Sequence, residues 1–159
     1  MARWWQWSHQ ACPHCRQDED ACHVICCPEV TEAWKAVVDS LLEWVDSTQP
    51  APATLALLGL MLDAWRSRWP MCLDIQWPEA LWQSVTEQKQ VGWASFLEGF
   101  VVCLWAMAQQ EYFTACGCCS LGQVWTTQLI GHLWMLGQHM WEHHNLVLHH
   151  GSSIPQFLC

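Results

Sequence analysis

Two closely spaced pairs of metal-binding residue types dominate the N-terminal part of the chain. Cys12 and Cys15 form a C-x2-C pair, and after seven intervening residues His23 and Cys27 form an H-x3-C pair. A C-x2-C pair on a tight turn presents two thiolates from one side, and residues four apart lie above one another on a helical turn. Zinc prefers four such ligands in a tetrahedron. The spacing therefore predicts a small zinc site with no open coordination position, which makes the metal structural rather than catalytic.

Four further residues lie close enough in the sequence to compete for this site, namely His9, His14, Cys22 and Cys26. We favour His23 and Cys27 because the Cys-Pro step that opens the segment is then mirrored by the Cys-Pro step that closes it. Proline restricts its own backbone and that of the preceding residue, which suits tight turns. The choice between Cys26 and Cys27 stays open, and so does the simpler interpretation of free thiols in a cysteine-rich chain.

The charge balance disfavours nucleic acid as an independent partner. The 159 residues include six Lys and Arg against fifteen Asp and Glu, a formal net charge of −9, and the cations form no cluster. Phosphate binding depends on a basic face, so the chain alone should mostly repel DNA and RNA. With 52% hydrophobic and 13% charged residues, the composition predicts one folded domain or module rather than a disordered chain.

The cysteine usage indicates a reducing compartment. Eleven cysteines are present, and the first ten residues show neither the apolar core nor the cleavage site of a signal peptide. We therefore expect an intracellular protein, cytoplasmic or nuclear and not secreted, whose thiols are free or bound to metal. The longest apolar run, Phe100 to Ala108, is too short to cross a bilayer. It predicts a buried helical segment and no membrane partner.

Hydrophobic periodicity predicts a mostly α fold, with a small zinc knuckle at residues 1–28, a helical domain at 29–150 and a tail at 151–159. Prolines, glycines and a cysteine-rich turn divide the helical domain into about five helices. These are expected from about residue 29 to Ser47, from an N-cap at Thr54 to about Trp69, from Glu79 to Gln90, from Gly92 to Thr114 and from Gly122 to His149. The last helix carries an apolar stripe of Trp125, Leu129, Leu133, Leu136 and Met140.

The order of these motifs resembles a known family. The C-P-x-C pattern at Cys12 to Cys15, the acidic insert Asp18-Glu19-Asp20 and the H-x3-C-P pattern from His23 to Pro28 look like the zinc-binding region that follows the polymerase domain in non-LTR-type retroelement reverse transcriptases. Two downstream blocks are also similar to that family. They comprise Glu87-Gln88, Val91-Gly92-Trp93, Phe96, Gly99, Trp105 and Gln109, and then Trp125, Leu129-Ile130, Leu133-Trp134, Trp141, Asn145 and His149.

The resemblance implies a non-catalytic C-terminal fragment that contacts template nucleic acid only as part of the full-length reverse transcriptase. The sequence holds no Y-x-D-D-like carboxylate pair, so two-metal polymerisation lacks its ligands. His144 stands where the family carries Arg, which removes a bidentate donor. Fourteen tryptophans exceed what so small a core can bury, and we expect an exposed Trp surface to contact a protein domain. The alternative is a free-standing protein-interaction or metal-handling protein.

Two histidine patterns carry weaker predictions. Residues 139–143 read H-x-x-E-H, an inverted zinc-peptidase motif, but a third ligand downstream is missing and a solvated helix face is favoured. His132, His139, His143 and His150 would form one stripe on an unbroken helix. Such a stripe would bind adventitious metal or respond to pH, although ordinary surface histidines are the favoured interpretation.

A cysteine-rich turn near the start of the last helix is the remaining pattern. Cys116, Cys118 and Cys119 would form a second thiolate cluster, together with Cys103 or Cys159. Vicinal cysteines rarely supply two ligands to one zinc ion, so a loop of free thiols is favoured.

Overall fold

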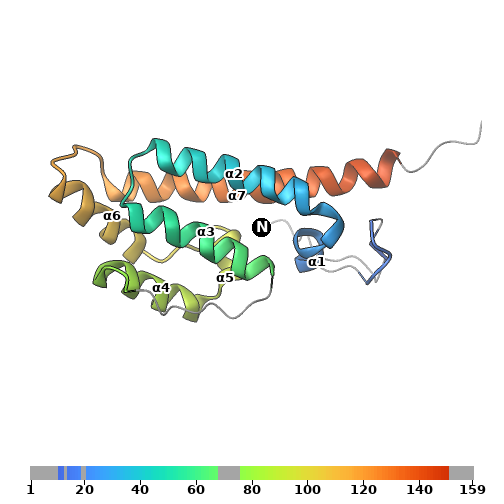
Figure 1. The fold of residues 1–159 in the computed structure, drawn as a ribbon, viewed down its shortest axis with the longest axis horizontal. Coiled ribbons are helices and arrows are strands. Elements are labelled where there is room, and N and C mark those ends of the chain that lie inside the picture. Colours follow the sequence, from blue (N-terminus) through green and yellow to red (C-terminus); the bar gives the residue numbers. More distant parts are fainter. Residues whose placement is uncertain (1–10, 13, 19–20, 68–75, 151–159) are drawn as a thin grey trace, which may run out of the picture.

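A long C-terminal helix and a second helix beside it organise the molecule along its longest axis (Figure 1). The computed structural model describes residues 11–12, 14–18, 21–67 and 76–150. Within them the fold is mostly helical, as predicted, with a Cys/His knuckle towards the N-terminus. In chain order the elements are α1 (Ala21–Cys26), the 3-10 turn η1 (Pro28–Val30), α2 (Thr31–Ser47), α3 (Pro52–Arg66), α4 (Glu79–Val91), α5 (Trp93–Leu97), α6 (Leu104–Ala115) and α7 (Gly122–His150).

Helix α7 is the central element of the fold, because α1, α2, α5 and α6 all contact it. Helix α3 packs on α2, and α4 packs on α6. The knuckle and α1 therefore lie at one end of the longest axis, and the connection from α6 to α7 lies at the other (Figure 1).

One hydrophobic core joins the knuckle to the helices. The predicted apolar stripe of α7, from Trp125 to Met140, is confirmed, since each of its five members is at most 3% exposed. Trp34, Leu41 and Val45 supply the buried face of α2. Cys12 and Cys27 belong to the same core cluster. A substitution at Cys12 or Cys27 is therefore expected to disturb the packing of the helical domain.

The prediction of a single helix from Gly92 to Thr114 is wrong. The chain forms α5 and α6 instead, so six helices rather than about five follow the knuckle in the described residues. Gly99 has a φ of 91°, which disfavours any residue with a side chain, and an added Cβ there would collide with Trp134. The buried Gln88 side chain replaces helical hydrogen bonds at the break. It accepts from the Val102 N–H over 3.0 Å and donates to the Phe100 carbonyl over 2.9 Å.

The expectation of a buried helical segment from Phe100 to Ala108 is also wrong. Phe100 is 60% exposed and Met107 is 56% exposed, whereas Trp105 is 1% exposed. The first residues of the run lie in the connection before α6, and the rest lie on more than one face of that helix. Among the described residues, no helix combines the length and the apolarity needed to cross a membrane.

The start of α3 differs from the prediction as well. Thr54 is not the N-cap; it lies inside the helix, is 3% exposed and donates its backbone N–H to the Ala51 carbonyl over 2.8 Å. The helix begins at Pro52, because proline is pre-organised for the first helical turn and lacks the N–H that would be unsatisfied there. It ends at Arg66, and the predicted end at Trp69 lies outside the described residues.

Candidate metal centre

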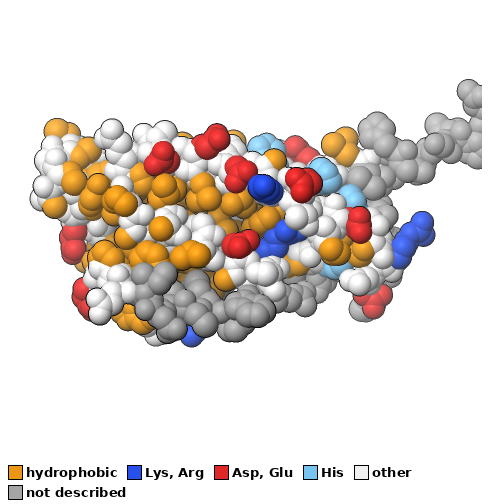
Figure 2. Space-filling view, viewed as in Figure 1, with side chains coloured by type: hydrophobic (Ala, Val, Ile, Leu, Met, Phe, Trp, Pro, Cys, Tyr) orange, Lys and Arg blue, Asp and Glu red, His pale blue; other side chains and the backbone are white. Residues whose placement is uncertain are grey.

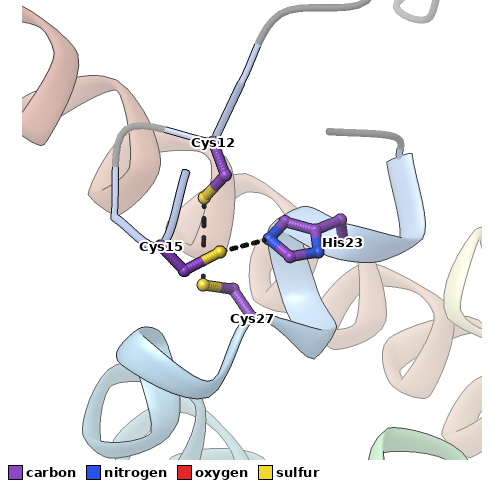
Figure 3. Close-up of side chains that lie close together, drawn as sticks. All are labelled: Cys12, Cys15, His23 and Cys27. Carbon is purple, nitrogen blue, oxygen red and sulfur yellow. Dashed lines mark hydrogen bonds between the residues drawn. The ribbon is translucent and has the colours of Figure 1, made fainter. Parts of the chain in front are cut away.

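The side chains of Cys12, Cys15, His23 and Cys27 point towards one another (Figure 3). One ligand atom from each of the four lies within 4.8 Å of the other three. The Cys12 and Cys27 sulfur atoms are 3.8 Å apart, and Cys15 Sγ is 3.1 Å from His23 Nε2. Cys12 is 0% exposed and Cys27 is 1% exposed, and the other two are half-buried. The group is compact and largely shielded from solvent.

The dimensions of the group suit a tetrahedral metal ion. Zinc–sulfur bonds of about 2.3 Å produce sulfur–sulfur edges of roughly 3.8 Å in a tetrahedron. The Cys12–Cys27 separation of 3.8 Å matches such an edge. The Cys15–His23 distance of 3.1 Å is shorter, as expected for a direct hydrogen bond between thiol and imidazole. Three thiols and one imidazole are a donor set typical of structural zinc sites. These four residues could hold a metal ion.

A tight turn positions the first two cysteines. The Cys12 N–H donates to the Gln17 carbonyl over 2.7 Å, and the Arg16 N–H donates to the Cys12 carbonyl over 2.8 Å. Ala11 and Asp18 form an isolated antiparallel bridge across the ends of the turn. Arg16 closes the turn with a φ of 66°, in the left-handed region that costs a non-glycine residue energy. This turn brings Cys12 and Cys15 to the same side.

The helix α1 and the turn after it position the second pair. His23 lies on α1, and the Cys27 N–H donates to the His23 carbonyl over 2.7 Å, which continues the helical turn by one residue. The two side chains therefore project from one face, as the four-residue spacing predicts. Pro28 then starts η1, and the Thr31 hydroxyl donates to the Pro28 carbonyl over 2.6 Å.

Arg66, at the end of α3, anchors this second segment. Its guanidinium donates to the carbonyls of Ile25 and Cys27, each over 3.3 Å, and to the Thr31 hydroxyl over 2.9 Å. The guanidinium also lies 5.9 Å from the centre of the Trp34 ring, within cation–π range. Nothing in the sequence pattern identifies Arg66, because its three acceptors lie 35 to 41 residues away and two of them are backbone carbonyls.

Burial favours the protonated thiol at Cys27 when no cation is bound. Burial raises the pKa of Cys27 to about 11, and hydrogen bonds with Cys15 and Cys12 add to the rise, while a backbone hydrogen bond at Glu29 opposes it. A thiolate here would lose hydration and face other sulfur atoms. A divalent cation reverses this balance, because it coordinates the thiolates directly and releases their protons.

The competing ligands are separated by the structure. Cys26 is half-buried and is not a member of the four-residue group, whereas Cys27 is. His14 instead faces α7, with its ring centre 5.7 Å from that of His143 and 5.8 Å from that of His144. His9 and the Cys22 side chain lie outside the described residues. His144, the residue that stands in place of an Arg in the family pattern, is 2% exposed and helps to dock the knuckle on α7.

The other histidine patterns do not gather into a site within the described part of the chain. The only group there with metal-binding geometry is the one around Cys12. His132 stacks on Trp44 with ring centres 4.0 Å apart, whereas His143 stacks on His14. Glu142 accepts a hydrogen bond from Gln138 over 2.7 Å. The His150 side chain lies outside the described residues, so the end of the proposed stripe is not described.

The cysteine-rich turn likewise holds no such group. Cys103, Cys116, Cys118 and Cys119 are exposed, and their sulfur atoms do not converge on a common point in the described structure. Cys159 lies outside it.

Comparison of the chain with family models, with curated proteins and with solved structures finds no match. The resemblance to retroelement reverse transcriptases therefore stays a prediction.

Proposed function

We propose that this chain is a non-catalytic helical module stabilised by one structural zinc ion, with Cys12, Cys15, His23 and Cys27 as its ligands. The observation that carries the proposal is the convergence of the four ligand atoms within 4.8 Å. Four protein ligands complete a tetrahedron, so no position remains for a water molecule or substrate. The near-complete burial of Cys12 and Cys27 further restricts access to the metal.

In this proposal the zinc ion joins two chain segments that have little structure of their own. The turn at Cys12 and the six-residue helix α1 are too short to be stable alone. Zinc binding supplies folding free energy to such small segments. The closed knuckle then presents His14 to α7 and the Cys27 carbonyl to Arg66, so that the metal orders one end of the helical domain.

We further propose that the module is the C-terminal region of a retroelement reverse transcriptase whose polymerase domain precedes it. Support comes from the ordered motifs around Cys12 to Pro28 and in the later helices. The net charge of −9 argues that nucleic acid is contacted only within the full-length protein. Figure 2 agrees with this view, since the face it draws has a broad apolar area bordered by Asp and Glu and carries few cations.

A second candidate, a protein-interaction module, is favoured by one exposed tryptophan. Trp134 is 63% exposed, yet its indole N–H donates to the Glu98 carbonyl over 2.9 Å and so holds the ring in place. A fixed aromatic ring on the surface is a common anchor at protein interfaces. In affinity purification of the tagged chain, Trp134→Ala should then reduce the amount of any partner protein that copurifies, whereas Trp82→Ala should not.

Native mass spectrometry and zinc analysis of the purified chain test the metal proposal. We expect about one zinc ion per chain, lost in the Cys12→Ser/Cys15→Ser double variant. Cys26→Ser is the matched control, because Cys26 neighbours Cys27 and lies outside the group. Zinc retained by the double variant, or lost in Cys26→Ser, would refute the assignment.

Fluorescence anisotropy with a short single-stranded RNA tests the nucleic-acid proposal. At neutral pH and ordinary salt the chain alone should show no specific binding, because its six Lys and Arg are scattered along the sequence and are outnumbered by fifteen Asp and Glu. Sub-micromolar affinity would show that the fragment grips a template by itself. Polymerase-coding sequence directly upstream of the Met1 codon would support the family assignment, and an unrelated upstream sequence would weaken it.

A further inference from the structure

Three exposed thiols occupy the connection between α6 and α7, at the end of the molecule opposite the metal centre (Figure 1). Cys116 caps α6, and Gly117, Cys118 and Cys119 follow it. The proposed zinc site uses none of them. Their position along the longest axis also keeps them away from Cys12 and its partners.

The backbone of this turn is fixed by the end of α6. The Gly117 N–H donates to the Thr114 carbonyl over 3.2 Å, and the Cys118 N–H donates to the Phe113 carbonyl over 2.8 Å. These two bonds, with a φ of 69° at Gly117, define a Schellman motif. Cys118 is therefore held just beyond the helix rather than in a loose loop.

Each of two thiols in the turn has a polar neighbour of its own. Cys118 Sγ lies 3.3 Å from the Ser120 hydroxyl. Hydrogen bonds from the side chain and then the backbone of Ser120 lower the pKa of the Cys118 thiol. Cys116 instead faces Tyr112, and their hydrogen bond raises the pKa of the Tyr112 hydroxyl. The turn therefore holds an accessible thiol with its own hydrogen-bond donors beside a second accessible thiol.

We propose that this turn is an oxidisable dithiol, in which Cys118 reacts with hydroperoxides and Cys116 resolves the product to a disulfide. Cys116 is the resolving residue because Gly117 alone separates it from Cys118, and a glycine there lets the turn leave the Schellman conformation when the disulfide forms. A bond between Cys118 and the adjacent Cys119 would close a small ring through a planar peptide, which is strained. Cys103 lies at the opposite, N-terminal end of α6, and no other cysteine lies near it in the sequence.

The reaction balances with a hydroperoxide as the only oxidant. The Cys118 thiolate attacks one peroxide oxygen, an S–O bond forms, the O–O bond breaks, and the leaving hydroxide or alkoxide takes up a proton. The Cys116 thiolate then attacks the Cys118 sulfur, an S–S bond forms, and the S–O bond breaks. The hydroxyl leaves as water with the proton that Cys116 lost. The two sulfur atoms together lose two electrons, and the peroxide bond gains them.

The test uses the entire 159-residue chain, loaded with zinc and treated with a substoichiometric amount of hydrogen peroxide. Remaining thiols are alkylated and the peptides are mapped by mass spectrometry. We expect a Cys116–Cys118 disulfide as the first product, with Cys103 still reduced. In Cys116→Ser, Cys118 should accumulate as a sulfenic acid that a dimedone probe traps. Circular dichroism checks that each variant is folded.

A substitution of the hydroxyl donor separates an assisted thiol from a merely exposed one. Ser120→Ala should slow peroxide reaction at Cys118 roughly three- to tenfold, because the thiolate loses a donor. Thr127→Ala, which removes an exposed hydroxyl from α7, is the control and should leave the rate unchanged. First oxidation at Cys103 or Cys119, a Cys118–Cys119 disulfide, or an unchanged rate in Ser120→Ala would overturn the proposal.

Discussion

The guanidinium of Arg66 donates a hydrogen bond over 3.3 Å to the backbone carbonyl of Cys27, the last member of the metal-binding group. This bond spans 39 residues of sequence and joins the end of α3 to the knuckle. The same side chain also reaches the Thr31 hydroxyl and the Trp34 ring. Arg66 is thus a positioning residue through which the helical domain orients one ligand segment.

Replacing Arg66 should therefore weaken both the fold and the metal site. Arg66→Ala is expected to lower the free energy of unfolding by about 2 kcal/mol, because three acceptors lose a charged donor. Arg66→Lys should recover only part of the loss, since one ammonium group cannot span the acceptors as a planar fork does. Urea denaturation and competition with a zinc chelator measure the two effects. Lys35→Ala, an exposed cation on α2, is the control, and an equal effect in that variant would argue against the anchor.

Gly122 should tolerate no side chain, because α7 starts against the backbone of α6. A Cβ at Gly122 would lie 2.8 Å from the Gln110 nitrogen and closer still to the Ala106 carbonyl oxygen. Gly122→Ala should cost roughly 3 kcal/mol or more of unfolding free energy, since neither contact atom is a flexible side chain end. Gly137→Ala on the same helix meets nothing within 4 Å and should stabilise by about 0.5–1 kcal/mol. Thermal denaturation measures the stability of the two variants. Similar melting temperatures for Gly122→Ala and Gly137→Ala would contradict the close approach of α7 to the α6 backbone.

Arg16 is expected to be a site of improvable stability. Its φ of 66° costs a non-glycine residue about 1 kcal/mol or more, which glycine avoids. Arg16→Gly should therefore raise the zinc affinity and the unfolding free energy by roughly 0.5–1 kcal/mol after the entropy of the unfolded chain is included. Gln17→Gly, at a neighbouring position with ordinary φ, should lower both. Competition with a zinc chelator compares the two variants. If Arg16→Gly loses as much zinc affinity as Gln17→Gly, the backbone at Arg16 is not strained.

The stability of the α2–α7 contact should depend on pH through His132. Burial lowers the pKa of His132 below its usual value near 6.5, and its ring lies 4.0 Å from that of Trp44. The unfolded chain therefore binds this proton first as pH falls, so the stabilising contribution is complete above about pH 6.5 and is lost as pH falls through the folded pKa. His132→Phe should flatten this part of the pH dependence in urea titrations between pH 7.5 and 5. If the unfolding free energy of His132→Phe falls as steeply with decreasing pH as that of the unsubstituted chain, the prediction is wrong.

Local pattern was sufficient for much of the fold. The spacing of Trp34, Leu41 and Val45 and the stripe from Trp125 to Met140 identify the buried faces of α2 and α7, because helical periodicity is a property of neighbouring residues. The break at Gly99 was not predictable in this way. It depends on Gln88 and Trp134, which approach it only in the folded chain.

The same distinction between local spacing and distant contacts applies to the candidate metal centre. Sequence alone determined which residues could bind metal, since C-x2-C and H-x3-C spacings place side chains on one side of a turn or helix without any distant contact. Only the tertiary structure decided that Cys27 and not Cys26 joins the group, that Arg66 holds its carbonyl and that His14 meets His143 and His144. These contacts join segments far apart in the chain, and their geometry is set by how the helices pack, which no local spacing encodes.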